Sequence, residues 1–376
     1  MKNKKIWLSS PHMGENEFKY VTQAFDLNWI APVGPHLNDF EKNLSKISDN
    51  KYVAALGSGT SAIHLALILL DVERDDEVIC SSFTFSASAN PIIYQGAKPV
   101  FIDSEMDTWN MCPESLELAI IDRIENRIKP KAIIVVHLYG MPAKMNEIIE
   151  VASRYNIPII EDAAEGLGST YYNKPLGSLT EFGIYSFNGN KIITTSGGGA
   201  LISSNEDSIK KAKFLATQAR DHAPHYEHSQ IGYNYRLSNV SAAIGLGQLE
   251  VLQDRVERRR EIFEHYQKEL SDINEISFVE EPDGFYSNRW LTTVLISANS
   301  KVSREDLRLN LELNNIESRP LWKPMHLQPI FSSCKYFGSN NAEYLFKYGL
   351  CLPSGSNMTE NDIARIITNI KRSFEK

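Results

Sequence analysis

The chain has 376 residues, of which 42% are hydrophobic and 23% charged, and its formal net charge at pH 7 is −8. This length allows one large domain with a sizeable core and a smaller second domain, and the acidic balance excludes a general attraction to nucleic acid or acidic membranes. Four scattered cysteines without a CxxC pair, the lack of a signal-peptide pattern and a longest apolar run (LALILL) too short to cross a bilayer predict a soluble cytoplasmic protein with reduced thiols.

Residues 53–203 alternate short apolar runs, rich in β-branched residues, with amphipathic stretches. Apolar residues at three- and four-residue spacing predict helices over 113–124 and 144–155. Strands that alternate with helices predict an α/β fold, with a largely parallel, doubly wound sheet between helices. The predicted buried strands are 77–80, 98–103, 131–140, 157–162 and 182–187.

The pattern changes near residue 250. Residues 249–270 predict one long amphipathic helix whose charges form a solvated face. Strand-like 288–297, helical 303–315 and a closing helix within 359–374 follow it. We therefore expect a large domain over residues 1–250 and a smaller C-terminal α+β domain over residues 251–376.

A run of small residues, GSGTSAIHLALILL at 57–70, comes directly before an apolar helical pattern. The first turn of a helix offers unpaired N–H groups and a partial positive charge, so phosphate binds there readily. The alternative is that Ser58 or Thr60 only caps the helix. The GxSxG nucleophile elbow does not fit LGSGT, and GNKI lacks the final hydroxyl residue of a Walker loop.

Two charged residues stand out at predicted strand ends. Asp162 ends IPIIED, either as a functional carboxylate or as a helix N-cap. Lys191 is the one charged residue in SFNGNKIITTSGGGALIS, residues 186–203, and follows one further strand. Ligands of open α/β sheets collect at the carboxyl ends of strands, so these two side chains and the glycine-rich run are expected at one crevice.

A phosphate-binding turn, a strand-end aspartate and an isolated lysine together suggest pyridoxal phosphate. That cofactor needs a lysine amine for its Schiff base, an anion beside the pyridinium nitrogen and donors for its phosphate. Phe85 is a candidate to stack on the ring, although such an aromatic residue is more often core. We expect no metal at His225 and His228, because a catalytic zinc site normally needs three protein ligands.

Taken in order, the motifs of the chain resemble those of the DegT-type sugar-nucleotide aminotransferases. These are pyridoxal phosphate enzymes with the aspartate-aminotransferase fold (fold type I). No single motif would be specific, but the whole series is. The motifs are NWIAPVGP, GSGTSAIHLAL, SSFTFSASANPI, HLYG, IIEDAAE, SFNGNKIITTSGGGAL, GYNYRLSN and RPLWKPMH.

The resemblance assigns roles to matching residues. Lys191 corresponds to the Schiff-base lysine, which must exchange covalent partners and so stands without a charged partner. Asp162 matches the aspartate that pairs with the pyridinium nitrogen. Gly59 and Thr60 fall where the family binds the cofactor phosphate, and Ser186 adds a hydroxyl to it.

Further positions follow from the same resemblance. Phe85 falls at the ring-stacking position, and Glu165 stands where many relatives have glutamine or histidine near the cofactor. Asn234, in GYNYR, matches an asparagine supplied by the neighbouring subunit, which implies a homodimer with shared active sites. Candidates for contacting the nucleotide sugar, each with a packing or capping role as the alternative, are Trp29, Arg236 and His326.

The resemblance implies amino transfer from L-glutamate to the C4 keto group of a nucleotide-linked 4-keto-6-deoxy sugar. SPHMGENE, DTWNM, HYEH, SNRWLTT and CLPSGSNMTE are most similar to enzymes of bacillosamine-type and exopolysaccharide pathways, which act on UDP-4-keto-6-deoxy-N-acetylglucosamine. The alternatives are a transaminase for a GDP- or dTDP-linked sugar, a sugar dehydratase, in which some relatives replace the lysine with histidine, and a cofactor-binding regulator. Lys191 favours amino transfer.

Overall fold

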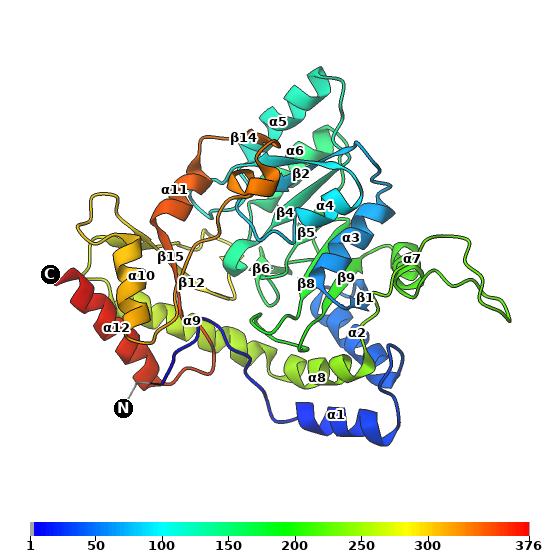
Figure 1. Ribbon diagram of the computed structural model, residues 1–376, viewed down its shortest axis with the longest axis horizontal. Coiled ribbons are helices and arrows are strands. Elements are labelled where there is room, and N and C mark those ends of the chain that lie inside the picture. Colours follow the sequence, from blue (N-terminus) through cyan, green and yellow to red (C-terminus); the bar gives the residue numbers. More distant parts are fainter. Residues whose placement is uncertain (1–3, 376) are drawn as a thin grey trace.

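The computed structural model describes residues 4–375 and is built around one sheet of eight strands (Figure 1). Every neighbouring pair is parallel, except that β9 runs antiparallel to both β1 and β8. The predicted, largely parallel α/β sheet is thus confirmed. In spatial order the strands are β1 (Tyr52–Leu56), β9 (Gly199–Ser203), β8 (Phe182–Ser186), β5 (Ile159–Asp162), β4 (Ala132–Val136), β2 (Glu77–Ser81), β3 (Lys98–Ile102) and β14 (Lys335–Phe337).

Alternate residues of each central strand pack into opposite layers, as the period of two in a strand requires. In β4, Ile133 and Val135 join one hydrophobic core, whereas Ala132 and Ile134 join the other. All five residues of β4 are buried, which explains why this strand reads as a continuous apolar run.

Helices cover both faces of this sheet. One core includes residues of α2 (Pro35–Ile47), α5 (Pro113–Glu125), α6 (Met145–Arg154) and α8 (Asn239–Glu250). The opposite core includes residues of α3 (Gly59–Leu69), α4 (Asn90–Tyr94) and α7 (Glu206–Ala216). The remaining short elements of this part are α1 (Glu17–Asp26), η1 (Leu138–Gly140), β6 (Thr170–Tyr171) and β7 (Lys174–Pro175).

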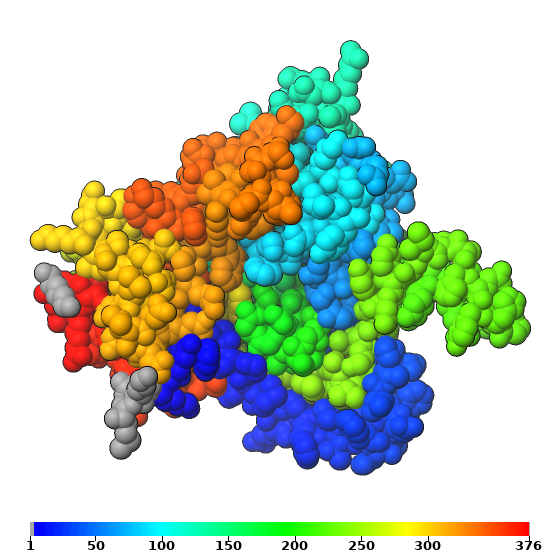
Figure 2. All heavy atoms as spheres, in the orientation of Figure 1, coloured from blue at the N-terminus to red at the C-terminus, as the bar shows by residue number. Residues whose placement is uncertain are grey.

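The C-terminal part has its own sheet, of order β10-β12-β15-β13, and its own core. Residues of the long helix α9 and of α10 and α12 pack in that core, and Figure 2 shows this part as one mass beside the larger one. No helix within residues 4–375 has both the length and the apolar character needed to cross a membrane. The elements are α9 (Leu252–Glu269), β10 (Ile276–Phe278), β11 (Phe285–Tyr286), β12 (Thr292–Ile296), α10 (Arg304–Leu313), β13 (Arg319–Pro320), η2 (Met325–Leu327), η3 (Pro329–Phe331), α11 (Asn341–Tyr348), β15 (Gly349–Leu352) and α12 (Glu360–Phe374).

The predicted boundary at residue 250 falls at the junction between α8 and α9. Helix α8 packs mainly on α1 and α2, whereas α9 contributes to the C-terminal core. Two segments cross this division, because β14 pairs with β3 in the large sheet and Ile6 belongs to the C-terminal core. The division into 1–250 and 251–376 stays a prediction.

The helix predicted over 249–270 is confirmed as α9, but it begins at Leu252, because the chain breaks at Val251 and residues 249–250 end a separate helix, α8, that was not predicted. The sequence hides α8 because Gly245 and Gly247 lower its helix propensity. Both glycines are required by close packing: an added Cβ at Gly245 would lie 2.5 Å from the Phe40 ring, and one at Gly247 would lie 2.7 Å from the Glu17 backbone nitrogen.

An arm of residues 217–238, between α7 and α8, extends away from the body of the molecule (Figure 1). Its Tyr226 and Ile231 side chains are 78% and 84% exposed. The arm returns beside its own start, where Thr217 and Asn234 form an isolated bridge.

Candidate active site

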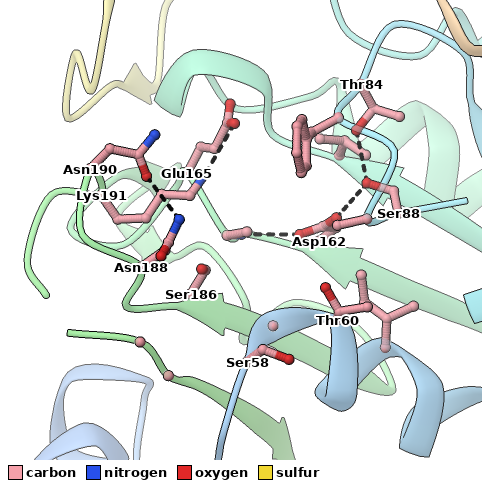
Figure 3. A pocket seen from close by; sticks show the side chains of 18 of the residues that line it. Ser58, Thr60, Thr84, Ser88, Asp162, Glu165, Ser186, Asn188, Asn190 and Lys191 are labelled. Carbon is pink, nitrogen blue, oxygen red and sulfur yellow. Dashed lines mark hydrogen bonds and ion pairs between the residues drawn. The ribbon is translucent and has the colours of Figure 1, made fainter. Parts of the chain in front are cut away.

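A cavity of about 310 Å³ lies at the carboxyl ends of β5 and β8, beside the first turn of α3 (Figure 3). Asp162, Lys191 and the glycine-rich run at residues 57–60 therefore meet at one place, as expected from the rule for open α/β sheets. The predicted residues that line the cavity are Gly59, Thr60, Phe85, Asp162, Glu165, Ser186 and Lys191.

The floor of the cavity is the start of α3. Ser58 is the N-cap, and its Oγ accepts a hydrogen bond of 3.0 Å from the backbone N–H of Ser61. This confirms the capping alternative for Ser58 but does not compete with phosphate binding, because the first turn of a helix has several donors and the cap uses one. Strand β9 lies against this turn so closely that a Cβ on Gly199 would be 2.3 Å from the nitrogen of Gly59.

Asp162 is buried at the end of β5, with its side chain held by two donors. Its Oδ2 accepts a hydrogen bond of 2.7 Å from Ser88 Oγ, and its Oδ1 accepts one of 3.1 Å from the N–H of Ala164. Burial raises the pKa of Asp162, and the two hydrogen bonds act in the opposite direction by favouring the charged form. A turn follows Asp162, so the helix N-cap interpretation is wrong.

Lys191 has a carboxylate partner. Its Nζ lies 3.2 Å from Glu165 Oε1, and both side chains are largely buried. Glu165 Oε2 accepts a hydrogen bond of 2.7 Å from the N–H of Tyr139, and burial raises the pKa of Glu165 while Lys191 lowers it. The expectation that Lys191 stands without a charged partner is therefore wrong, because the fold brings Glu165 across from another strand end.

The small hydroxyl and glycine residues around Lys191 fold its loop onto Phe187. The carbonyl of Phe187 accepts hydrogen bonds from the N–H of Thr195 at 3.0 Å and from Thr194 Oγ1 at 3.1 Å. A Cβ on Gly198 would lie 2.3 Å from Thr195 Oγ1, so a side chain there would displace that hydroxyl group. This unusual composition thus has a structural cause.

Several lining residues were not found by sequence reasoning. Ser88 and Thr84 lie on the Asp162 side of the cavity (Figure 3), and their hydroxyl groups are 2.8 Å apart. Trp290 and Trp322 reach the same cavity from the C-terminal half of the chain. Both tryptophans occur within the quoted motifs SNRWLTT and RPLWKPMH, but no local pattern distinguishes an aromatic cavity wall from core.

Four predicted site residues do not line this cavity. Asn234 is exposed on the arm, and Trp29 is 43% exposed, with its carbonyl accepting a hydrogen bond of 2.8 Å from Asn239 Nδ2. Arg236 Nη1 donates to the carbonyl of Ala55 at 2.8 Å and also contacts Glu41. His326 lies 2.6 Å from Ser82 Oγ. The packing alternative therefore describes Arg236 and His326 within one subunit.

His225 and His228, the pair weighed as metal ligands, each lie close to another group. His228 Nδ1 is 2.9 Å from the carbonyl of Gln218, and His225 Nε2 is 3.2 Å from Glu227. Across residues 4–375, no group of three or more His, Cys, Asp or Glu side chains is arranged to hold a metal ion.

The cavity fits pyridoxal phosphate by its donors and acceptors. The start of α3 and Ser186 offer donors for a phosphate, Asp162 keeps acceptor capacity for a ring N–H, and Lys191 offers an amine. Phe85 is 60% exposed at the cavity wall, where an aromatic face is open for stacking. A buried carboxylate, a buried amine and a helix N-terminus share this one cavity, the combination that the cofactor needs.

Comparisons with known proteins agree with this site. The sequence profile of the DegT/DnrJ/EryC1/StrS aminotransferase family matches residues 11–371. The chain is 53% identical over 376 residues to EpsN of Bacillus subtilis, which is named for a proposed pyridoxal phosphate-dependent aminotransferase activity, with 99% of this chain and 96% of that protein covered. It is 37% identical over 366 residues to the GDP-perosamine synthase of Caulobacter vibrioides, with 96% of each covered.

A solved structure gives the same result for the fold. The PLP-form of Spr1654, a proposed sugar aminotransferase from Streptococcus pneumoniae, superposes with a TM-score of 0.90 at 26% identity, with 99% of each chain covered. Family, relatives and fold agree with a cavity that is built for pyridoxal phosphate. The chain therefore belongs to the DegT/DnrJ/EryC1/StrS aminotransferase family and is a pyridoxal phosphate-dependent sugar aminotransferase.

Proposed function

We propose that this enzyme transfers the amino group of L-glutamate to the C4 keto group of a nucleotide-linked 4-keto-6-deoxy sugar, UDP-4-keto-6-deoxy-N-acetylglucosamine. The observation that carries the proposal is the shared cavity of the Lys191 amine and the Asp162 carboxylate, with the α3 turn beside them. A lysine at this position is the group that exchanges covalent partners with an incoming amine.

Bound pyridoxal phosphate supplies an electron sink for the carbanion left when an amino acid loses its α-proton. The residues of the chain do the rest. Lys191 would hold the cofactor through its amine, and when free its Nζ would take up and return the substrate proton. The same amine serves both half-reactions: removal of the amino group from glutamate, and its delivery to the keto sugar.

Three side chains prepare the site for Lys191. Asp162, held by Ser88, faces the place of a ring N–H and favours its protonated form by charge. Glu165 accepts a hydrogen bond from the Lys191 amine and holds it within the cavity. Phe85 orients a flat ring against the cavity wall.

The nucleotide is the part of the proposal with a competing candidate. The UDP-linked sugar rests on the motifs that resemble bacillosamine-type enzymes. A GDP-linked sugar has support from the similarity to GDP-perosamine synthase. Dehydration is disfavoured, because that reaction is associated with histidine in place of Lys191.

The proposal includes a homodimer with shared active sites. Asn234 is exposed at the base of the arm, where it bridges Thr217, and it does not line the cavity of its own subunit. An arm of this kind is suited to reach a neighbouring subunit. In a symmetric pair each arm would complete the other cavity.

The test measures transfer of labelled nitrogen from glutamate to the sugar. The purified enzyme is incubated with ¹⁵N-glutamate and, in separate reactions, UDP-, GDP- and dTDP-linked 4-keto-6-deoxy sugars, and the products are weighed by mass spectrometry. We expect a ¹⁵N-amino sugar from the UDP-linked substrate, with Lys191→Ala as the inactive control. A ¹⁵N product from the GDP-linked sugar alone would show that the substrate carries GDP and not UDP. Loss of a hydroxyl group from the sugar without gain of nitrogen would overturn amino transfer.

A further inference from the structure

Trp290 lies directly against the reacting amine. Its side chain is 1% exposed, it lines the cavity, and Lys191 Nζ is 4.1 Å from the centroid of its ring. An ammonium group within about 6 Å of an indole face is attracted to the ring. The amine therefore has two neighbours of different kinds, the Glu165 carboxylate and the Trp290 ring.

The same indole also fixes the peptide bond that precedes Lys191. Trp290 Nε1 donates a hydrogen bond of 2.7 Å to the carbonyl of Asn190, and Ser9 Oγ donates a second one of 2.7 Å to that carbonyl. A backbone carbonyl has two lone pairs, so both are occupied. On the other side of this peptide bond, the N–H of Lys191 is bound to the carbonyl of Asn188 at 3.0 Å.

Trp290 is itself held rigidly by the segment that leads into β12. Its N–H donates to Asn288 Oδ1 at 2.8 Å, and its carbonyl accepts a hydrogen bond from the buried Arg259. Asn288 Nδ2 in turn donates to the carbonyl of Glu165 at 2.8 Å. The segment 288–290 therefore binds the backbone at both members of the ion pair: the carbonyl of Asn190, next to Lys191, and the carbonyl of Glu165 itself.

The geometry points to Trp290 as the positioning residue for Lys191: its N–H fixes the peptide bond before the lysine, and its ring holds the amine in place. This inference rests on the proposed function only in taking Lys191 as the reacting amine. The indole ring of Trp290 is expected to restrict the Lys191 amine, and its N–H is expected to restrict the backbone at Asn190. Each action predicts a separate measurement.

The experiment uses the full-length protein freed of cofactor. Three variants separate the two actions: Trp290→Phe keeps an aromatic face without the N–H, and Trp290→Leu removes both. Ser9→Ala keeps the indole and removes the second donor to Asn190, together with the acceptor of a 2.9 Å hydrogen bond from Arg259 Nη2. Trp322→Phe is the control, because Trp322 lines the same cavity and its Nε1 has no hydrogen-bond partner among residues 4–375. Amide hydrogen exchange over 188–195 reports on the backbone, and the acylation rate of Lys191, followed by peptide mass spectrometry, reports on the amine.

We expect exchange over 188–195 to rise about fivefold in all three variants, the size that follows from one lost hydrogen bond. Acylation of Lys191 should rise about fivefold in Trp290→Leu, as for a lost cation–π contact, and should change little in Ser9→Ala. Exchange in β4 and both readouts in Trp322→Phe should stay within about twofold, below the effect of one lost hydrogen bond.

Unchanged exchange and acylation in Trp290→Leu and Trp290→Phe would overturn the inference. So would a uniform rise that includes β4, because Trp290 would then be ordinary core. If Trp290→Leu does not fold, amide hydrogen exchange over 188–195 in Trp290→Phe and Ser9→Ala tests the inference. None of these measurements needs a sugar or cofactor, so a failure of the proposed amino transfer would be seen separately, in the nitrogen assay.

Discussion

Ser88 is the residue on which the charge of Asp162 depends most directly. Its hydroxyl donates the shorter of the two hydrogen bonds to that carboxylate, and burial alone would favour the neutral acid. We expect Ser88→Ala to weaken binding of pyridoxal phosphate about tenfold, the effect of one hydrogen bond to a charged group. Titration of the visible absorption measures this. Ser86→Ala is the matched control, and equal affinity in Ser88→Ala and Ser86→Ala would contradict the role of Ser88.

Glu161 is a buried carboxyl group that faces away from the cavity, with its Oε2 3.8 Å from His137 Nε2. Burial raises the pKa of Glu161, so the folded protein keeps a proton that the unfolded chain releases above pH of about 4.3. Unfolding then releases protons, and the free energy of unfolding falls as pH rises from there toward the folded pKa.

The side chain in the Glu161→Gln variant cannot ionise, so the free energy of unfolding of the variant should fall less than that of the wild type over that pH range. At pH 7 we expect it to be more stable than the wild type by about 1 kcal/mol, because the cost of burying the charge exceeds its attraction to His137, 3.8 Å away. Thermal unfolding at pH 4.5 and pH 7 measures the difference. Exposed Glu150→Gln is the control. A Glu161→Gln protein less stable than the wild type at pH 7 would show that the carboxylate is stabilising.

At the scale of elements, the contact between β9 and the start of α3 shapes the phosphate site. A Cβ on Gly199 would meet the backbone of Gly59 and Ser58 at 2.3 and 2.4 Å, and backbone cannot move aside as a flexible side chain does. We expect Gly199→Ala to weaken cofactor binding by more than about tenfold and to lower the unfolding midpoint, as overpacking does. The control is Gly189→Ala, whose Cβ would meet only Pro11, at 3.9 Å. Equal cofactor affinity in the two variants would contradict this account.

The same contact shows what the sequence could predict at this scale. Asp162 and Lys191 were predicted together because parallel strands end at one edge, a rule that needs only strand order. The glycines of 197–199 were visible, but the α3 turn that excludes a side chain at Gly199 comes from a segment about 140 residues earlier along the chain. Helix α8 was missed for the same reason, since its glycines are explained only by α1 and α2.

At the scale of the whole molecule, the cavity wall is assembled from both halves of the chain. Trp290 and Trp322 enter beside residues 57–60, more than two hundred residues away in sequence. The sequence offers no pattern for such pairs, because hydrophobic periodicity reports which face is buried and not what it meets. The partner of Lys191 was missed likewise: Glu165 was predicted for the cofactor, and its ion pair with Lys191 depends on the turn after β5.

The proposed homodimer makes a prediction at this scale. If Asn234 completes the cavity of the neighbouring subunit, Lys191→Ala and Asn234→Ala damage different subunits of one site. A refolded equal mixture of the two inactive variants should recover about a quarter of wild-type activity, because half of the dimers then carry one intact site of two. Nitrogen transfer from ¹⁵N-glutamate measures it. A mixture as inactive as its components would contradict a site shared in this way.

The central claim, that Lys191 carries amino transfer, is tested most directly by the visible absorption of the loaded enzyme. L-Glutamate should abolish the yellow absorption of the cofactor in the wild type, and the UDP-linked keto sugar should restore it. Lys191→Ala should bind the cofactor without its native absorption and should complete no such cycle. A wild-type spectrum that glutamate leaves unchanged, or a Lys191→Ala protein that completes the cycle at the wild-type rate, would contradict the account.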